Sequence, residues 1–269
     1  LARKTGVLPK VIVPVHFAGL ATEQETIWEL AQEFGCKVLE DASHSLGAFR
    51  QGEPVGSCKW SDITVFSFHP VKIITTGEGG MALTNDKQLA ERMRMLRAHG
   101  ITRDEKQLEK KSEGLWYYEQ QLLGFNYRMT DIQAALGYSQ LDRLETFVKK
   151  RRAHASRYFD LLSNLPLQLQ EELPEYKSSW HLFVVRVKRD NRHKMSRRDL
   201  FGELRAKGVG VNVHYIPIHL QPYYRQLGFS SGQFPEAETH GKQAITLPLY
   251  PDLDEQSQER VVSILKHLL

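Results

Sequence analysis

The succession of a strand, a helix and a second strand near the start of the chain constrains its fold more than any other feature. Residues 10–15 are a short apolar run that suits a buried strand. The spacing predicts a helix over residues 22–34, with Thr22 beginning a capping box and Gly35 ending the helix. Residues 36–40 are the next apolar run. This βαβ order predicts a parallel sheet with helices outside it.

The later predicted elements fall into two groups. The first group continues the sheet domain with two strands, a helix and a polar, irregular segment, at residues 61–67, 79–84, 87–96 and 101–121. Thr130 begins a long helical pattern that runs to about residue 162 and is typical of a helix linking two domains. The second group follows Pro166 and contains a strand, a helix, a strand and a final helix, at residues 180–187, 196–207, 209–215 and 256–269.

These elements predict an α/β protein of two domains. Residues 1–145 are expected to form the remainder of a large, mostly parallel sheet domain. Residues 146–269 are expected to form an interdomain helix and a small α+β C-terminal domain. Because the first residue is Leu1 and a buried strand follows almost at once, we expect the large domain to have a further N-terminal segment.

Composition and charge exclude several functional classes. The chain is 41% hydrophobic and 25% charged, which is typical of a soluble globular protein. Its net charge of +4 does not predict nucleic-acid binding, and the densest basic run, residues 149–152, is typical of a solvated helix face. No apolar run is long enough for a membrane span, and no signal-peptide pattern is visible in the residues given. Cys36 and Cys58 lack a metal-type spacing, so we predict no metal site and a reducing, cytoplasmic location.

Two acidic residues, Glu40 and Asp41, end the second predicted strand, and His44 follows three residues after Asp41. Ligands of open α/β sheets bind beyond the carboxyl ends of the strands. A carboxylate at that place can hold a protonated ring nitrogen, whereas a simpler role for Asp41 is to cap a helix N-terminus. Taken alone, the pattern favours the capping role.

Lys72 is surrounded mainly by apolar residues in the sequence. It lies five residues after Ser67, the end of a predicted strand, among the side chains of Phe68, Pro70, Val71, Ile73 and Ile74. Most lysines are solvated surface residues, but a desolvated lysine loses its proton more easily and becomes a nucleophile for carbonyl groups. The glycines among residues 77–80 allow positive φ angles close to a ligand, and they suit a hairpin-like turn equally well.

Five segments occur in the order found in one enzyme family: EDASHSLGA, SFHPVKIITTGEGG, NYRMTDIQAALG, VHYIPIHLQPYY and LPLYP. Through them the chain resembles, over essentially its whole length, the DegT family of sugar aminotransferases. The resemblance implies the type I fold of PLP-dependent transferases (aspartate aminotransferase-like), with pyridoxal 5′-phosphate (PLP) as cofactor. The runs HGITRD, WYYEQQLLGFNYRMTD and VNVHYIPIHLQPYYRQLGF are most similar to 4-aminotransferases of pseudaminic acid biosynthesis, which act on a UDP-linked 4-keto-6-deoxy-N-acetyl sugar.

Position by position, the resemblance implies roles around the cofactor. Lys72 corresponds to the lysine that forms a Schiff base with PLP and moves protons, and Asp41 to the carboxylate that pairs with the pyridinium nitrogen. His44 corresponds to a residue against the PLP ring, and Ser67 to a hydroxyl that donates to the PLP phosphate. Asn126 corresponds to a residue that reaches the phosphate or the substrate from the neighbouring subunit.

The other implied roles concern the substrates. His214 and Tyr215 correspond to a segment that lines the sugar-nucleotide pocket. Arg128 is a candidate anion partner for glutamate or the diphosphate, with a structural salt bridge as the alternative. His16 corresponds to a loop near the cofactor, with a turn histidine satisfied by the backbone as the alternative. The implied reaction transfers an amino group from L-glutamate to C4 of the nucleotide keto sugar by ping-pong kinetics, in a homodimer with shared active sites, for surface-glycan synthesis.

Several other functions stay open. A 3- or 4-aminotransferase for another nucleotide keto sugar belongs to the same family, and a non-catalytic regulatory relative shares its fold. Loss of catalysis should remove Lys72 or Asp41, and both are present. Dehydratase relatives replace that lysine with histidine or need more cysteines than Cys36 and Cys58 for an iron–sulfur site. A Rossmann dehydrogenase is disfavoured because no GxGxxG turn follows the first strand.

Overall fold

The computed structural model describes residues 6–188 and 195–269. The chain divides into two compact units, each made of three segments. Unit 1 consists of Leu1–His16, Ala21–Leu46 and Glu53–Arg143. Unit 2 consists of Phe17–Leu20, Gly47–Gly52 and Leu144–Leu269. Two short segments from the early part of the chain therefore complete the C-terminal unit.

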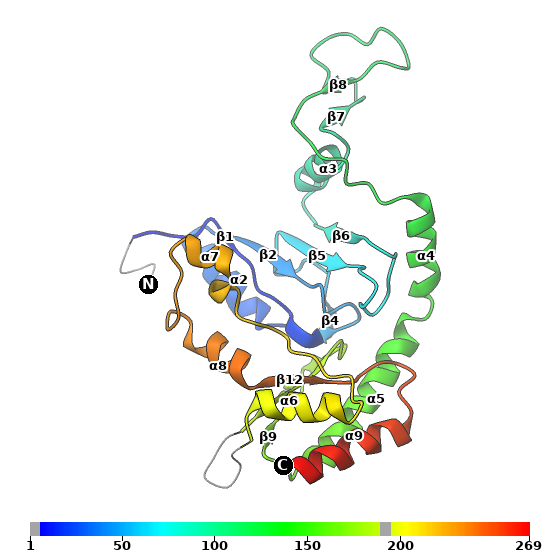
Figure 1. Ribbon diagram of the computed structural model, residues 1–269. Coiled ribbons are helices and arrows are strands. Elements are labelled where there is room, and N and C mark those ends of the chain that lie inside the picture. Colours follow the sequence, from blue (N-terminus) through cyan, green and yellow to red (C-terminus); the bar gives the residue numbers. More distant parts are fainter. Residues whose placement is uncertain (1–5, 189–194) are drawn as a thin grey trace. The chain divides into compact units, whose positions relative to one another are not determined.

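Unit 1 is built on a four-stranded sheet with the strand order β1-β2-β5-β6 (Figure 1). These strands are β1 (Val11–Ile12), β2 (Lys37–Asp41), β5 (Ile63–Ser67) and β6 (Gly80–Leu83). β1, β2 and β5 run parallel, and β6 is antiparallel to β5. The predicted βαβ unit is confirmed, because α2 (Gln24–Phe34) joins the parallel strands β1 and β2.

The helix α2 packs on the sheet through a small apolar cluster. Its members are Ala31, Cys36 and Val38, with Ile12, Ile27, Trp28 and Phe34 against them. Gly35 ends the helix in the left-handed region, with a φ of 67°, as predicted. The predicted capping box at Thr22 is wrong. Glu23 is the N-cap and makes no side-chain cap bond, since the Thr22 hydroxyl donates to the side chain of Gln24 instead.

Outside the sheet, unit 1 contains β4 (Glu53–Pro54), α3 (Lys87–Leu96), β7 (Ile101–Thr102), β8 (Glu119–Gln120) and α4 (Asp131–Leu141). The helix predicted over residues 87–96 is confirmed as α3, and the Asp86 side chain caps it by accepting from two backbone amides. The segment predicted to be irregular has short paired strands at its two ends, because β7 and β8 are antiparallel neighbours.

The long helix predicted from Thr130 is two helices, α4 and α5 (Leu144–Leu162). Thr130 does begin α4, in a complete capping box with Gln133. The helices are separated at Asp142 and Arg143, where the chain passes from unit 1 to unit 2. Ile132, expected in a buried apolar stripe, is 85% exposed, so the predicted burial is wrong at this residue.

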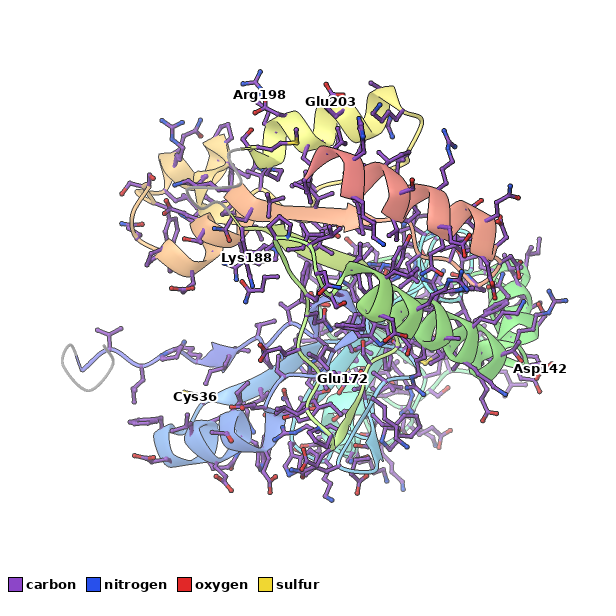
Figure 2. The ribbon with its side chains drawn as sticks, turned by 90° about the horizontal axis from the view of Figure 1, so that it is seen from below. Cys36, Asp142, Glu172, Lys188, Arg198 and Glu203 are labelled. Atoms are coloured by element: carbon purple, nitrogen blue, oxygen red, sulfur yellow. The ribbon has the colours of Figure 1, made fainter. Side chains whose placement is uncertain are left out.

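Unit 2 contains a three-stranded antiparallel sheet in the order β12-β11-β9. Its regular elements are η1 (Phe17–Gly19), β3 (Phe49–Arg50), α5, β9 (Leu167–Gln168), β10 (Tyr176–Lys177), β11 (Phe183–Val187), α6 (Arg197–Ala206), η2 (Ile218–Leu220), α7 (Pro222–Gln226), α8 (Pro235–Gln243), β12 (Ala244–Leu247) and α9 (Glu255–Leu268). Arg198 and Glu203 project outward from α6 (Figure 2). Tyr158, Phe183, Leu204, Ile245 and Leu265 are among the buried side chains that hold the helices on the sheet.

The helices predicted at residues 196–207 and 256–269 are confirmed as α6 and α9, and β11 confirms most of the strand predicted at 180–187. The strand predicted at 209–215 is wrong. Only Asn212 pairs there, in an isolated bridge with Thr246. Within the two described ranges, no helix has the length and apolar character needed to cross a membrane.

Candidate active site

The carboxyl ends of two neighbouring parallel strands in unit 1 carry predicted site residues. Asp41 is the last residue of β2, and Ser67 is the last residue of β5. The Ala42 amide donates to the Val65 carbonyl oxygen over 2.9 Å, so the two strands stay paired up to this edge. Lys72 lies in the loop that follows β5. This is the edge of an open α/β sheet at which ligands bind.

The loop that carries Lys72 is closely fixed between β5 and β6. The Phe68 amide donates to the Gly79 carbonyl oxygen over 2.9 Å and closes the base of the loop. Ile73 and Ile74, directly after Lys72, are only 6% and 2% exposed and anchor the loop in the interior. Lys72 therefore extends from a rigid backbone.

The glycines after Lys72 permit close packing as well as a turn. Gly77 has a φ of 81°, in the left-handed region, which confirms the predicted turn. A Cβ atom at Gly79 would lie 2.3 Å from Thr76 Oγ1. A Cβ atom at Gly137, in α4, would lie 2.6 Å from Thr76 Cγ2. Larger residues at these two positions would displace the loop, so α4 packs directly on the segment that follows Lys72.

The electrostatic environment of Lys72 favours a reactive amine. Its side chain is half-buried, and burial lowers the pKa of the ammonium group below its usual 10.5. The nearby carboxylate of Asp41 acts in the opposite direction and raises that pKa by a smaller amount. A lowered pKa increases the fraction of unprotonated amine at neutral pH, which is the nucleophilic form.

Asp41 is held by its own turn. Its Oδ1 atom accepts a hydrogen bond from the Ser43 amide over 3.0 Å. The chain after Asp41 makes turns and then enters β3, so the carboxylate does not cap a helix there. His44 lies in the same turn and is buried. Thus Asp41 and Ser67 end β2 and β5, and His44 and Lys72 lie in the loops that follow these two strands.

His16 lies beyond the end of β1 and is almost fully buried. Its Nδ1 accepts from the Thr22 amide over 3.1 Å, which confirms the expectation of a turn histidine satisfied by the backbone. Its Nε2 lies 3.3 Å from Oε2 of Glu40. No spacing in the sequence indicates this second partner, because Glu40 and His16 are 24 residues apart.

Asn126 and Arg128 lie elsewhere in unit 1, between β8 and α4, and both are exposed. Asn126 forms an isolated antiparallel bridge with Ala98, just after α3. His214 and Tyr215 belong to unit 2. His214 Nδ1 lies 2.7 Å from Thr246 Oγ1 on β12, and Tyr215 is 51% exposed.

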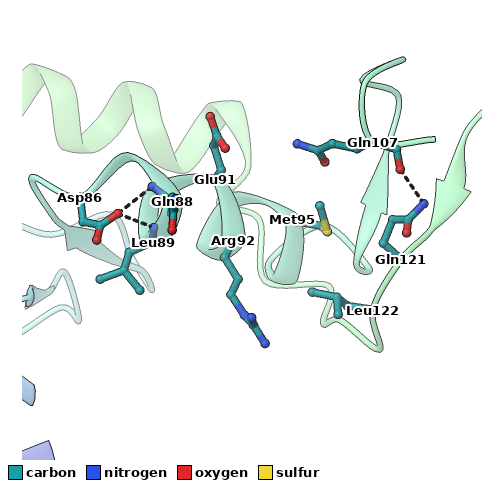
Figure 3. A pocket seen from close by; sticks show the side chains of 9 residues that line it. All are labelled: Asp86, Gln88, Leu89, Glu91, Arg92, Met95, Gln107, Gln121 and Leu122. Carbon is teal, nitrogen blue, oxygen red and sulfur yellow. Dashed lines mark hydrogen bonds between the residues drawn. The ribbon is translucent and has the colours of Figure 1, made fainter. Parts of the chain in front are cut away.

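A separate pocket of about 530 Å³ lies beside α3 (Figure 3). It is lined by Asp86, Gln88, Leu89, Glu91, Arg92, Met95, Gln107, Gln121 and Leu122. None of the predicted site residues is among them. Asp86 accepts from two backbone amides as the cap of α3, and the Gln121 side chain donates to the Gln107 carbonyl oxygen over 3.1 Å. These polar groups serve the local fold, so the pocket is not a candidate for the chemistry.

One buried carboxylate organises the segment after Tyr215, and no sequence signal identified it. Glu238 of α8 is 5% exposed. Its Oε1 accepts from His219 Nε2 over 3.0 Å and from the Gly232 amide over 2.6 Å, and its Oε2 accepts from the Ser231 hydroxyl over 2.9 Å. These bonds, that of His219 first, lower the pKa of the Glu238 carboxyl to about 2. Glu238 thus ties three points of this segment to α8.

We expect acid to weaken this tie in a pH range set by Glu238. A carboxyl whose pKa is depressed on folding stabilises the folded state fully above its unfolded value of about 4.5. That stability is lost as the pH falls toward about 2. Glu238→Gln should lower the Tm at pH 7 and flatten its decline between those two pH values. Thermal unfolding across this range checks the effect.

The matched control for this measurement is Glu236→Gln, an exposed glutamate in the first turn of the same helix. The control should keep the pH dependence of the unchanged protein. An equally steep decline in Glu238→Gln would contradict the stabilising role of the buried carboxylate.

Comparisons with known proteins extend these observations to the whole chain. The profile of the DegT/DnrJ/EryC1/StrS aminotransferase family matches residues 1–266. An uncharacterized protein of Methanocaldococcus jannaschii is 39% identical over 262 residues, which are 97% of this chain and 67% of that protein. The spore coat polysaccharide biosynthesis protein SpsC of Bacillus subtilis is 35% identical over 263 residues, with the same coverage of 97% and 67%.

The solved structure of Helicobacter pylori PseC, an aminotransferase involved in the biosynthesis of pseudoaminic acid, is similar over the full chain. The match covers 100% of this chain and 69% of PseC, with a TM-score of 0.87 and 31% sequence identity. This chain therefore spans about two thirds of the length of the relatives described.

Proposed function

This chain belongs to the DegT/DnrJ/EryC1/StrS aminotransferase family, and on that premise we propose that it transfers an amino group from L-glutamate to C4 of a UDP-linked 4-keto-6-deoxy-N-acetylhexosamine. Members of the family are PLP-dependent sugar aminotransferases, so the predicted cofactor and the predicted type I fold are both confirmed. The position of the keto group and the identity of the sugar are the proposed part.

One observation carries the proposal. The half-buried amine of Lys72 has a lowered pKa, which the charge of Asp41 partly raises again. Lys72 and Asp41 lie beside the carboxyl ends of the parallel strands β2 and β5. A nucleophilic amine and a carboxylate are the two groups that PLP chemistry needs from a protein. This supports Lys72 as the amine that bonds to PLP, and Asp41 as the partner of its ring nitrogen.

The residues at this edge fit PLP group by group. The aldehyde needs an unprotonated amine, which the lowered pKa of Lys72 favours. The ring nitrogen needs a carboxylate, which Asp41 supplies. The phosphate needs hydrogen-bond donors, and the Ser67 hydroxyl accepts from the His69 amide over 3.4 Å, which leaves its own proton for donation. We assign the buried His44, in the turn after Asp41, to contact with the ring.

The protein's part in the reaction follows from these groups. When bound, PLP supplies an aldehyde carbon that exchanges amines and a ring that stabilises negative charge at the reacting carbon. Lys72 Nζ removes a proton from the α-carbon of glutamate, and in the second half of the reaction it returns a proton to C4 of the sugar. The Asp41 carboxylate, held by the Ser43 amide, keeps a proton on the ring nitrogen.

The choice of substrate rests on the relatives. The name of SpsC associates that protein with spore coat polysaccharide biosynthesis, and PseC is described as involved in the biosynthesis of pseudoaminic acid. We propose that His214 and Tyr215 line the sugar-nucleotide pocket and that Arg128 binds an anionic group of a substrate. The reaction would take place in the cytoplasm, where buried free thiols such as Cys36 and Cys58 persist.

A panel of keto sugars tests the function. The PLP-loaded protein is incubated with glutamate and, in turn, with UDP-linked 4-keto-6-deoxy-N-acetylhexosamines of different stereochemistry and with a 3-keto nucleotide sugar. We expect a 4-amino sugar and 2-oxoglutarate in equal amounts, detected by mass spectrometry. Amino transfer only to the 3-keto sugar would favour the alternative aminotransferase. A coloured, PLP-bound protein that aminates no sugar would favour a regulatory relative.

We also propose that the enzyme is a homodimer, with the stretch between α3 and the end of α4 at the interface. Six large apolar or aromatic side chains of this stretch are at least 70% exposed: Leu115, Trp116, Leu123, Tyr127, Ile132 and Tyr138. Large apolar side chains that are exposed on a monomer are typical of protein interfaces when they gather on one surface. Asn126 lies in the same stretch, which supports its donation to the active site of a second copy.

A single charge should disrupt this interface. We expect Ile132→Glu to weaken dimerisation at least about tenfold, because the new carboxylate would be buried without a partner. Sedimentation velocity over a range of concentrations measures the change. Leu173→Glu is the matched control, since Leu173 is also exposed and apolar but lies in unit 2. A monomeric, fully active protein would contradict the shared site.

A further inference from the structure

We propose that His16 and Glu40 are positioning residues, which hold Asp41 in place through a buried hydrogen-bond network on the other face of the sheet. Successive side chains of a strand point to opposite faces, so Glu40 and Asp41, neighbours in β2, lie on different sides. Glu40 is buried, whereas Asp41 is at the half-buried edge with Lys72. The inference rests on the proposed role of Asp41 as partner of the PLP ring nitrogen.

The hydrogen bonds of His16 have a defined direction. A backbone amide can only donate, so His16 Nδ1 is the acceptor of the Thr22 bond and carries no proton. The proton of the neutral ring is therefore on Nε2, which donates to Oε2 of Glu40 over 3.3 Å. The same oxygen accepts from the Thr64 hydroxyl over 3.1 Å. Glu40 Oε2 thus joins the segment that follows β1 to the central strand β5.

The network continues behind Thr64. The hydroxyl oxygen of Thr64 lies 3.2 Å from Ser61 Oγ and 3.3 Å from Cys58 Sγ. Because Thr64 has one hydroxyl proton and gives it to Glu40, its oxygen can only accept from Ser61 and Cys58, and the Cys58 thiol has the Gly56 carbonyl oxygen as a second acceptor. His16, Glu40 and Thr64 are 1%, 5% and 0% exposed, so water does not supply replacement bonds.

Backbone bonds connect this network directly to Asp41. The His16 amide donates to the Asp41 carbonyl oxygen over 3.0 Å, and the Asp41 amide donates to the Pro14 carbonyl oxygen over 2.9 Å. His16 therefore contacts residue 40 through its ring and residue 41 through its backbone. The regular strand β1 ends at Ile12, so these bonds are what tie the segment beyond it to the end of β2.

This arrangement has a consequence for the site rather than for stability alone. Replacing a buried polar pair with apolar residues often leaves stability unchanged, so such a pair is weak evidence for a stabilising role. A displacement of about 1 Å at a reacting group, in contrast, can cost about 10²-fold in rate. The network holds Glu40, the residue before Asp41, through its side chain, and it holds Asp41 through backbone bonds to Pro14 and His16. Together these bonds set the direction of the Asp41 carboxylate.

The test compares Glu40→Leu with Glu40→Gln in the PLP-loaded protein. Leu removes the acceptor, whereas the Gln carbonyl oxygen can take the place of Oε2 and keep both bonds. We expect Glu40→Leu to lower kcat about 10- to 100-fold with little change in KM. It should also raise the midpoint of the pH titration of the visible PLP band by about half a pH unit or more. The midpoint rises because a misplaced Asp41 no longer keeps a proton on the ring nitrogen of PLP. Without that positive charge, a second proton binds close to the ring at a higher pH.

Glu40→Gln should restore kcat and the midpoint to near the unchanged values. A purely structural role would lower the Tm of Glu40→Leu but leave kcat per folded molecule and the midpoint unchanged, and that result would overturn the proposal. If Glu40→Leu does not fold, Thr64→Val removes one of the two donors. It should shift the midpoint in the same direction, and an unshifted midpoint would again overturn the proposal.

Asp41→Asn, titrated in parallel, separates this inference from the proposed function. A shifted midpoint in Asp41→Asn together with an unshifted one in Glu40→Leu would refute the positioning role alone. Unshifted midpoints in both variants would instead refute the role of Asp41 itself.

Discussion

Lys72→Ala will abolish amino transfer, by at least about 10⁴-fold in turnover, together with the visible absorption of the PLP-loaded protein. Both effects have one cause, because the same amine is proposed to bond to the cofactor and to move the proton. The rate measurement uses glutamate and the 4-keto nucleotide sugar, and the absorption spectrum is recorded on the same samples. An unchanged visible band in Lys72→Ala would refute the assignment.

Two further variants serve as controls for this experiment. Lys72→Arg keeps a positive charge at the same place, but a guanidinium does not release its proton in a protein. We therefore expect it to be as inactive as Lys72→Ala, which would show that nucleophilicity and not charge is required. Lys87→Ala removes an exposed lysine at the start of α3 and should retain activity and colour.

The sequence was sufficient to predict the edge of the sheet at which Lys72 and Asp41 lie. The alternation of apolar strands with a helix implies parallel strands, and parallel strands place their carboxyl ends together. Of the apolar residues around Lys72, Phe68, Ile73 and Ile74 are buried and anchor its loop, whereas Pro70 and Val71 are exposed. Local sequence thus sufficed where each side chain's environment is made by its own neighbours along the chain.

The polar networks were not predictable in the same way. The bond between His16 and Glu40 spans 24 residues, and that between His219 and Glu238 spans 19. Neither pair has a spacing that repeats with a helix or a strand. In each case the tertiary packing of different elements brings the two partners together. A single sequence does not specify that packing.

The helical pattern that begins at Thr130 failed for a related reason. Ile132 is apolar, and the helical pattern predicts that its side chain is buried in the core of its own chain. Its side chain is instead 85% exposed. Periodicity detects an apolar face but not what covers it. The proposed second copy of the chain would explain why α4 carries apolar residues that its own unit does not bury.

Asp41→Asn is expected to lower turnover about 10²- to 10³-fold or more while leaving the fold intact. Asparagine has the shape of aspartate, and its carbonyl oxygen can still accept from the Ser43 amide, as Oδ1 of Asp41 does. What the variant loses is the negative charge that we propose keeps a proton on the ring nitrogen. Asp142→Asn, at an exposed position between α4 and α5, is the matched control and should retain full turnover.

For Asp41→Asn we also predict the direction in which the pKa of Lys72 changes. The charge of Asp41 raises the pKa of the Lys72 amine, against the larger lowering by burial. Removing that charge should therefore lower the pKa of Lys72 further, so its amine reacts with an aldehyde at lower pH in the cofactor-free protein. The rate of PLP incorporation as a function of pH measures this shift. Slower turnover combined with an unshifted incorporation profile would mean that Asp41 serves the cofactor ring but does not act on Lys72, and a shift to higher pH would contradict the electrostatic pairing of the two residues.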